Sequence, residues 1–281
     1  MAEILILGGD KRLQYAAATI SKRYSTEIYK AEQQKLPSDK GRKYKAVVLG
    51  IPCSADGESV SMPSYNERVS FTALCDMVDG NGIITGGLIP EKLYGICGER
   101  GIVCEDYYKN ESVILKNAVP SAEGALALGI NLTADTICNA NVLITGYGRI
   151  ASLLAKYLTA LGAKVTVAAR KEEKRVLAEI NGCKSIDFNR LADIIGEFSL
   201  IYNTVPALVI DEEAARRISK SAVYIELASK NGIDAALCGK SGVNFVGASG
   251  LPAKTAPKTA GEIIAKSIMQ ILDRHGEKIK P

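Results

Sequence analysis

The sequence contains only one histidine, His275, among 281 residues. It falls in the last turn of a predicted C-terminal helix, next to Gly276, where a cation interacts favourably with the helix dipole. The chain therefore has no credible histidine acid or base for catalysis. This argues against two-domain dehydrogenases of 2-hydroxy acids, whose hydride transfer depends on such a group.

Paired cysteines, strong charge and long apolar runs are also missing. The seven cysteines are scattered singly and form no Cys-x-x-Cys pair, which argues against a zinc site and a disulfide framework. We expect free, mostly buried thiols.

The net charge of +4 is too mild for nucleic acid but suits small anionic ligands. No run approaches a membrane span in length and Met1-Ala2-Glu3 opens no signal peptide, so we expect a cytoplasmic protein.

The chain length predicts two domains. Hydrophobic residues make up 47% of the sequence and charged residues 23%, as in soluble globular proteins with sizeable cores. Short apolar runs alternate with helical patterns, which predicts an α/β fold with parallel sheets. We expect an N-terminal α/β domain on the substrate side over residues 1–118 and a Rossmann dinucleotide-binding domain over residues 119–250. A C-terminal loop and helix, residues 251–281, are expected to pack back on the first domain.

The strand-like runs support this division. The first domain is expected to hold strands at residues 4–7, 27–29, 46–49, 83–85 and 102–104, with helices at 11–21, 67–78 and 90–99. The second domain is expected to hold six strands, at residues 142–145, 164–169, 184–187, 200–203, 222–227 and 243–246. The polar connection over residues 50–66 is long, as functional or disordered loops are. Gly8-Gly9 resembles a nucleotide-binding turn but lacks the third small residue, so we interpret it as a simple turn.

Two segments link these domains in the sequence. Pro120-Ser121 is expected to open a helix that runs to about residue 136, with Ser121 as its N-cap and Glu123 in its first turn. Residues 250–261 are expected to form a loop stiffened by two prolines. Thr259 is a candidate cap for the helix that follows it and reaches Arg274.

The most informative motif is Gly-x-Gly-x-x-Ala after the β-branched run at residues 142–145. Gly146 makes the tight strand-to-helix turn, Gly148 lets a pyrophosphate approach the backbone, and Ala151 lets the helix pack closely on the strand. The helix N-terminus then meets the negative charge. Because strand, helix and second strand all fall where the motif requires them, we predict a dinucleotide site that includes Tyr147, Arg149 and Ile150.

The cofactor is indicated at the end of the second strand, residues 164–169. An NAD enzyme usually carries an acidic residue there for the ribose hydroxyls. This chain has Ala169 followed by Arg170 and Lys171 instead. An arginine can donate two hydrogen bonds to a 2′-phosphate, which favours the phosphorylated cofactor by roughly ten- to a hundredfold. We therefore predict NADP rather than NAD, although a solvated helix start with intrahelical ion pairs also accounts for this run.

Two further strand ends are expected to line the ligand crevice beside the nicotinamide, because ligands bind at the carboxyl edge of such sheets. An alternative interpretation is that both are simple strand-to-loop turns. The residues are Asn203, Thr204, Val205 and Pro206 in one segment, and Leu227, Ala228 and Ser229 in the other.

Taken together, these segments resemble the A-subunit family of dipicolinate synthase. The resemblance covers almost the full length, and the first-domain loops diverge most. It is carried by Pro52-Cys53-Ser54, Asn66-Glu67, residues 117–124, Gly146-Tyr147-Gly148-Arg149, Ala169-Arg170, Asn203-Thr204-Val205-Pro206, Glu226-Leu227-Ala228-Ser229, Gly250-Leu251-Pro252 and residues 256–261. The resemblance implies a mother-cell enzyme of spore-forming bacteria that makes pyridine-2,6-dicarboxylate from the dihydrodipicolinate branch of lysine biosynthesis. It also implies a flavoprotein-like partner, the B-subunit of dipicolinate synthase.

That reaction is compatible with the missing histidine. Oxidation of a dihydropyridine moves a hydride to the nicotinamide, and aromatisation supplies driving force, so a strong base is unnecessary. The enzyme must mainly orient two carboxylates in a closed cleft. The candidate substrate-binding residues are Lys258, Lys254 and Ser54, with Asp10 and Arg12 behind them, and also Ser121. Lys258 and Glu123 are the catalytic candidates, although each of these residues also has a solvated or capping interpretation.

Two other functions stay open. The chain could be another two-domain NADP oxidoreductase, acting on an amino acid or an imine. It could also be a cofactor-binding regulatory subunit with no chemistry of its own. We expect the chain to form a homo-oligomer and to bind no metal, no nucleic acid and no membrane.

Overall fold

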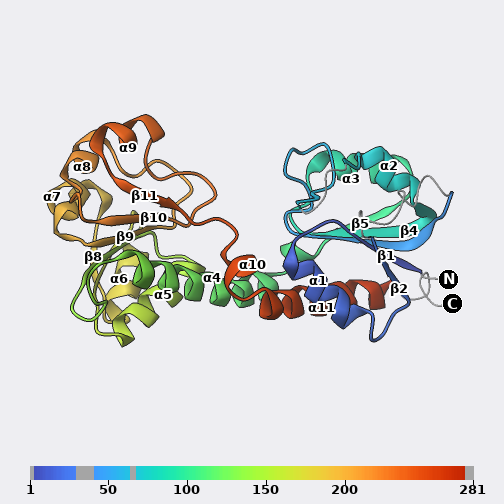
Figure 1. Ribbon diagram of the computed structural model, residues 1–281, viewed down its shortest axis with the longest axis horizontal. Helices are drawn as coiled ribbons and strands as arrows, with labels where there is room; N and C mark the ends of the chain where they lie inside the picture. The colour runs from blue at the N-terminus through green and yellow to red at the C-terminus, as the bar shows by residue number, and fades with distance from the viewer. Residues whose placement is uncertain (1–2, 30–40, 64–67, 276–281) are drawn as a thin grey trace. The chain divides into compact units, whose positions relative to one another are not determined.

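The computed structural model describes residues 3–29, 41–63 and 68–275. The chain divides into two compact units (Figure 1). The first comprises residues 1–117 together with 256–281, and the second comprises residues 118–255. Each unit is an α/β layer structure around its own parallel sheet. The predicted residues Asn66 and Glu67 lie outside the described part.

The first sheet has the strand order β2-β1-β3-β4-β5, with all neighbours parallel. Alternate residues of β1 face opposite layers of helices, as the pleat of a strand requires. Ile4 and Ile6 belong to a core with α1 and the C-terminal helix α11 (Pro257–Arg274). Leu5 and Leu7 belong to a core with α2 and α3. The elements are β1 (Ile4–Leu7), α1 (Lys11–Ile20), β2 (Thr26–Ile28), β3 (Tyr44–Leu49), α2 (Phe71–Asp76), β4 (Val78–Gly86), α3 (Glu91–Glu99), β5 (Val103–Asp106) and η2 (Tyr107–Lys109).

The second sheet has the order β11-β10-β9-β6-β7-β8, again all parallel, and contains all six predicted strands. Val142 and Ile144 of β6 pack with α5, whereas Leu143 packs with α7 and α8 on the other face. The elements are β6 (Asn141–Thr145), α5 (Arg149–Ala160), β7 (Lys164–Ala168), α6 (Glu172–Ile180), β8 (Lys184–Ile186), η3 (Phe188–Arg190), α7 (Leu191–Ile194), η4 (Ile195–Glu197), β9 (Leu200–Asn203), α8 (Glu212–Arg217), β10 (Val223–Glu226), α9 (Ala235–Ser241) and β11 (Asn244–Gly247).

Helix α4 (Glu111–Leu132) begins about ten residues earlier than predicted and holds Pro120 in its interior. Ser121 is therefore not an N-cap. Asn110 takes that place, because its side-chain Oδ1 accepts the amide of Ser112 at 3.0 Å. Within the described residues α4 is the one helix long and apolar enough to cross a membrane, contrary to the expectation of no such run. Half of its apolar window is buried, as in the core helix of a globular protein.

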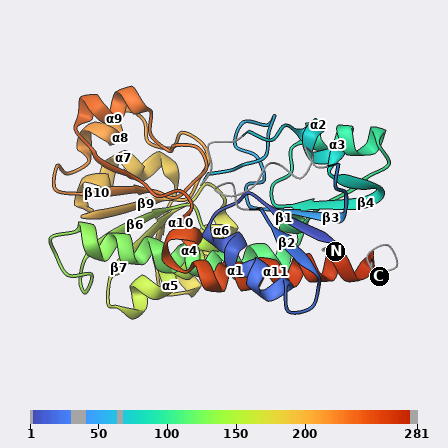
Figure 2. The ribbon, with the colours of Figure 1, turned by 45° about the vertical axis from the view of Figure 1, so that its right-hand side comes forward.

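The predicted proline-stiffened loop is instead helical. Residues Leu251–Thr255 form α10, which groups with the second unit, and α11 (Pro257–Arg274) begins two residues later. Thr259 lies inside α11, and Pro257 at its first position sets the start. Helices α1 and α11 lie side by side in both views (Figures 1 and 2). Gly261 makes this possible, since a Cβ there would lie 2.5 Å from the carbonyl oxygen of Arg12.

Candidate functional site

The second sheet has a topological switch point between β6 and β9. The chain leaves β6 toward β7 and β8 on one side, and then returns to β9 on the other side. Connections after β6 and β9 therefore diverge, and they leave a crevice at the carboxyl edge. A cavity of about 610 Å³ occupies this place. Its lining residues are Gly146, Tyr147, Gly148, Ala169, Arg170, Lys171, Lys174, Phe188 and residues 204–209.

The turn after β6 requires glycine at position 146. Gly146 has a φ of +85°, and a Cβ there would lie 2.6 Å from the Thr204 hydroxyl and 2.8 Å from Val205. The same hydroxyl donates to the carbonyl oxygen of Thr145 at 2.7 Å. The turn after β6 and the loop after β9 are thus fastened together at the floor of the cavity.

The start of α5 is open toward the cavity. Gly148 is the N-cap residue, it supplies no side-chain cap, and a Cβ built on it meets nothing within 4 Å. Backbone amides at such a start form a site for a phosphate group. Ala151 is fully buried against the sheet, as predicted from its place in the motif. Arg149 and Ile150 are the first residues of α5 and are not among the residues that line the cavity.

Positive side chains gather where β7 ends. Ala169 is buried, whereas Arg170 and Lys171 are exposed, and all three line the cavity together with Lys174. Lys171, the N-cap residue of α6, also lies 3.6 Å from Glu173, so part of its charge is paired at the start of that helix. No acidic side chain is among the residues lining the cavity. The end of β7 therefore suits a phosphate better than it suits ribose hydroxyls alone.

Arg175 holds this strand end in place from behind. Its guanidinium donates to the carbonyl oxygens of Ala169 at 2.8 Å and Arg170 at 2.9 Å, and to the Asp187 carboxylate at 2.6 Å. Its chain neighbour Lys174 lines the cavity, as does Phe188, the neighbour of Asp187. Arg175 and Asp187 thus form a bracket that fixes the backbone of Arg170, which the sequence alone did not reveal.

Asn203 is fully buried, so its amide has a positioning role in this structure. Its Oδ1 accepts the Thr145 hydroxyl at 2.5 Å, and its Nδ2 donates to the Val205 carbonyl at 3.0 Å and the Glu226 carboxylate at 2.7 Å. Glu226 is 3% exposed and also accepts the amides of Ala228 at 2.9 Å and Gly232 at 2.7 Å.

This buried network ties the loops after β9 and β10 together at the carboxyl edge. Glu226 is a charged residue at the end of the otherwise apolar strand β10, and this pattern is the sequence signal that could have indicated its buried role. The predicted residues Leu227, Ala228 and Ser229 follow it directly but do not line the cavity. Thr204, Val205 and Pro206 do line it.

The first sheet has its own switch point between β1 and β3, and two predicted substrate residues follow these strands. Asp10 caps α1 by accepting the amide of Arg12 at 2.9 Å, and its carboxylate also pairs with the Arg12 guanidinium at 2.7 Å. Arg12 is 7% exposed and also donates to the carbonyl oxygen of Ile51. Asp10 therefore joins the loops after β1 and β3 in this structure.

Ser54 lies in an ordered part of the long loop after β3. Its hydroxyl accepts the amide of Gly57 at 3.0 Å and donates to the Asp56 carboxylate at 3.2 Å. Asp56 also accepts the amides of Glu58 and Ser59, both at 2.8 Å. These bonds, the Glu58 amide first, hold the pKa of the Asp56 carboxyl well below its usual range.

The other predicted substrate and catalytic residues lie on helices. Ser121 is buried within α4, and Glu123 is exposed on the same helix. Lys254 is exposed on α10 and Lys258 is exposed in the first turn of α11. The structure joins none of these four to the cavity in the second unit, so their roles stay predictions. In the described part of the chain no group of His, Cys, Asp or Glu is arranged to hold a metal ion.

Comparison with known proteins supports the family resemblance. Residues 3–108 match the family model for the N-terminal domain of the dipicolinate synthase A-subunit. The corresponding A-subunit of Bacillus subtilis is 25% identical over 229 residues, covering 81% of this chain and 77% of the relative. The crystal structure of the Bacillus halodurans A-subunit has a TM-score of 0.84 at 25% identity, and the match covers 96% of this chain and 97% of that one.

The fold extends beyond that family. The D-lactate dehydrogenase of Escherichia coli has a TM-score of 0.68 at 11% identity, covering 98% of this chain and 96% of that one. The resemblance to the A-subunit of dipicolinate synthase, inferred from the motifs, is thus confirmed, and so is the two-domain dehydrogenase-like fold. The one histidine of the chain, His275, caps the C-terminal end of α11, with its Nε2 3.3 Å from Glu105.

Proposed function

We propose that this chain, similar along its length to the A-subunit of dipicolinate synthase, is an NADP-dependent oxidoreductase that oxidises dihydrodipicolinate to dipicolinate. One observation carries the cofactor half of the proposal. The cavity at the second switch point combines the open helix start at Gly148 with a cluster of cations at the end of β7. These features match the two phosphate positions of a phosphorylated dinucleotide.

The residues present fit NADP, because different groups in the cavity suit different parts of the cofactor. The amides at the start of α5 would bind the pyrophosphate, and Arg170 with Lys174 would bind the 2′-phosphate. The Asn203–Glu226 network would hold the loops beside the nicotinamide in a fixed conformation. The bound nicotinamide supplies the hydride acceptor.

The substrate half is carried by the family resemblance. A dihydropyridine with two carboxylates needs cations and amide or hydroxyl donors that orient it. We propose that Lys254 and Lys258 bind carboxylate oxygens. We also propose that the Ser54 hydroxyl, near the first switch point, turns from Asp56 to donate its hydrogen bond to the substrate. Ser121 and Asp10 position their helices, since both side chains are engaged or buried. Glu123 fixes α4 rather than transferring a proton.

The resemblance also supports a setting for the reaction. We propose that the chain works in the mother-cell cytoplasm of a spore-forming bacterium, together with the flavoprotein-like B-subunit of dipicolinate synthase. It forms a homo-oligomer under this proposal. Aromatisation supplies the driving force, so the proton lost from the ring can pass to water.

The test mixes freshly generated dihydrodipicolinate, NADP and the purified chain, with and without the flavoprotein-like partner, and follows NADPH and dipicolinate together. Equal molar appearance of both products supports the proposal. NADP binding without NADPH formation under either condition would reject it. That second outcome would favour a regulatory role, or an oxidoreductase acting on an amino acid or imine.

A further inference from the structure

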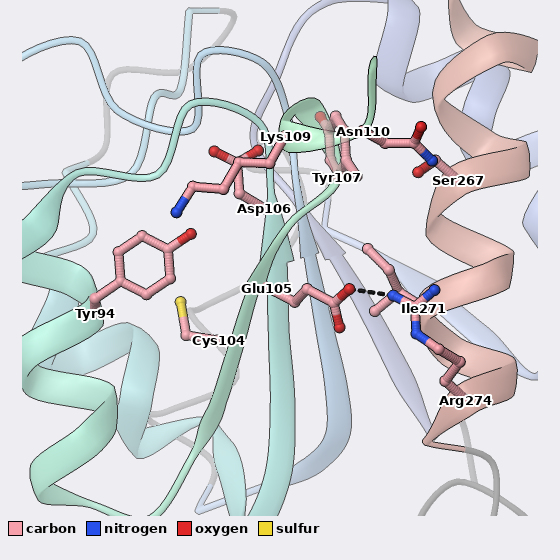
Figure 3. A pocket seen from close by; sticks show the side chains of 10 residues that line it. All are labelled: Tyr94, Cys104, Glu105, Asp106, Tyr107, Lys109, Asn110, Ser267, Ile271 and Arg274. Atoms are coloured by element: carbon pink, nitrogen blue, oxygen red, sulfur yellow. Dashed lines mark hydrogen bonds and ion pairs between the residues drawn. The ribbon is translucent and has the colours of Figure 1, made fainter. Parts of the chain in front are cut away.

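The first unit holds a second cavity, of about 390 Å³, beside the edge strand β5. Tyr94 on α3 and three residues of α11 lie on opposite sides of it (Figure 3). Its volume is in the range of small-molecule sites, and none of the predicted cofactor or substrate residues lines it. The lining residues are Tyr94, Cys104, Glu105, Asp106, Tyr107, Lys109, Asn110, Ser267, Ile271 and Arg274.

One side of this cavity presents a cation. The Lys109 ammonium lies 4.6 Å from the centre of the Tyr94 ring, and Figure 3 shows it beside the Tyr94 hydroxyl. Among the described residues no carboxylate oxygen pairs with Lys109 within 4.0 Å. Burial raises the pKa of Tyr94, so its hydroxyl remains a donor. This side therefore offers two donors to an anionic group.

The opposite side presents an unpartnered hydroxyl. Ser267 lies in the buried face of α11 and is only 4% exposed. It lines the cavity and has no hydrogen-bond partner among the residues that the structure describes. Because this hydroxyl opens onto the cavity, it is available to a molecule bound there.

The cavity also presents negative charge. Glu105 is neutralised by its ion pair with Arg274, which Figure 3 shows, and by His275 at 3.3 Å. Asp106 has no cationic partner within 4.0 Å among the described residues. Its Oδ1 accepts two backbone amides and its Oδ2 accepts only one, so Oδ2 can accept a further donor.

Lys109 and Asp106 thus leave one positive and one negative group unpaired in the same small cavity. A purely anionic ligand would meet Asp106, and a purely cationic ligand would meet Lys109. A molecule that carries both charges on neighbouring atoms satisfies both groups. We propose that this cavity binds a free α-amino acid. Its carboxylate contacts Lys109 and the Tyr94 hydroxyl, its ammonium contacts Asp106, and Ser267 contacts its polar part.

The binding test uses the full-length chain without any nicotinamide cofactor, so that its outcome does not depend on the proposed reaction. Isothermal titration calorimetry is run with each of the twenty free amino acids. The best binder is then compared with its methyl ester, which lacks the carboxylate charge, and its N-acetyl derivative, which lacks the ammonium. We expect saturable binding of the free amino acid and a loss of roughly tenfold or more with either derivative.

Variants locate the binding in this cavity. Lys109→Met and Tyr94→Phe keep most of the packing and should each weaken binding, Lys109→Met by roughly tenfold or more. Ser267→Ala is nearly isosteric and should weaken it less. Lys116→Met, an exposed lysine of α4 outside the cavity, is the matched control and should bind normally. Absence of binding by all twenty amino acids, equal binding of either derivative, or normal binding by both Lys109→Met and Tyr94→Phe would each overturn the proposal.

Discussion

The proposed preference for NADP depends on Arg170 in a way that can be measured directly. Its side chain is exposed and lines the cavity at the end of β7, while its backbone carbonyl is held by Arg175 at 2.9 Å. Arg170→Gln therefore removes the charge without removing the bond that fixes the strand end. Arg170→Asp places a carboxylate where NAD enzymes carry one.

The size of the effect follows from the contact that is lost. A charge-assisted hydrogen bond contributes about 1.5–3 kcal/mol, which corresponds to roughly ten- to a hundredfold in affinity. Because Arg170 is exposed and Lys174 remains, we expect Arg170→Gln to weaken NADPH near the lower end of this range. NADH binding should change by less than about twofold, since NADH has no 2′-phosphate. Arg170→Asp should improve NADH relative to NADPH beyond the Gln variant.

The assay is a titration of NADPH and NADH by fluorescence at low and moderate salt. The advantage of NADPH should shrink as salt rises in the native chain and much less in Arg170→Gln, because salt screens exposed charges. Arg190→Gln is the control, since Arg190 is an exposed arginine that pairs with Asp193 and does not line the cavity. An unchanged NADPH-to-NADH ratio in Arg170→Gln would refute the assigned role.

Four further outcomes are expected. Arg175→Gln should weaken both dinucleotides, because it frees the strand end and leaves Asp187 unpaired, whereas Arg170→Gln affects only NADPH in the same titration. Glu226→Gln should lower the free energy of unfolding in urea by about 1–3 kcal/mol, since its new amide faces donors. Gly146→Ala should abolish dinucleotide binding in calorimetry, because its φ is +85° and its Cβ would meet Thr204. Burial raises the pKa of Cys53 from 9.0 to about 12. The thiol therefore ionises at lower pH in the unfolded chain, and the free energy of unfolding should fall as pH rises from about 9 to 12. Cys53→Ala should reduce that fall in urea titrations over this pH range.

The fold of the second unit was largely predictable because its signals are local. The four inner strands of the second sheet, β6, β7, β9 and β10, are mainly apolar runs of four or five residues between helical patterns. The turn after β6 needs glycine because its backbone has a φ of +85° at Gly146. Gly146 and Gly148 stand at the spacing that the motif requires. The position of Arg170 beside the cavity follows from its distance to this turn, whereas its contact with a 2′-phosphate stays a prediction. None of these inferences required knowledge of a distant contact.

The start of α4 was misread because two signals competed. Pro120 and Ser121 together look like a helix start, since proline is favoured at the first helical position. Asn110 is an equally good cap ten residues earlier, and it is the one the structure uses. Pro120 then costs one internal hydrogen bond, which the apolar packing of neighbours such as Ala118 and Ala122 offsets. The tertiary packing that determines where α4 begins cannot be seen in the local sequence pattern.

Polar partners that meet across the fold were equally hidden. The Arg12 side chain reaches Ile51 and the Asn203 side chain reaches Glu226, over 39 and 23 residues of sequence. Such pairs follow from strand order, which a single sequence does not specify. For this reason Asp10 and Asn203 were predicted as ligand contacts, whereas the structure engages both side chains in joining neighbouring loops.

The two sheets also differ in how well they suit the proposed dinucleotide, although both have a switch point and a glycine turn. In the first sheet a Cβ on Gly50 would lie 2.6 Å from Gly9, so the loops after β1 and β3 touch as closely as those after β6 and β9. The helix starts differ. Asp10 accepts the Arg12 amide at the start of α1, so a carboxylate of the protein already occupies the place of an anion. Gly148 supplies no such group to α5, and the positive end of that helix is left for a phosphate.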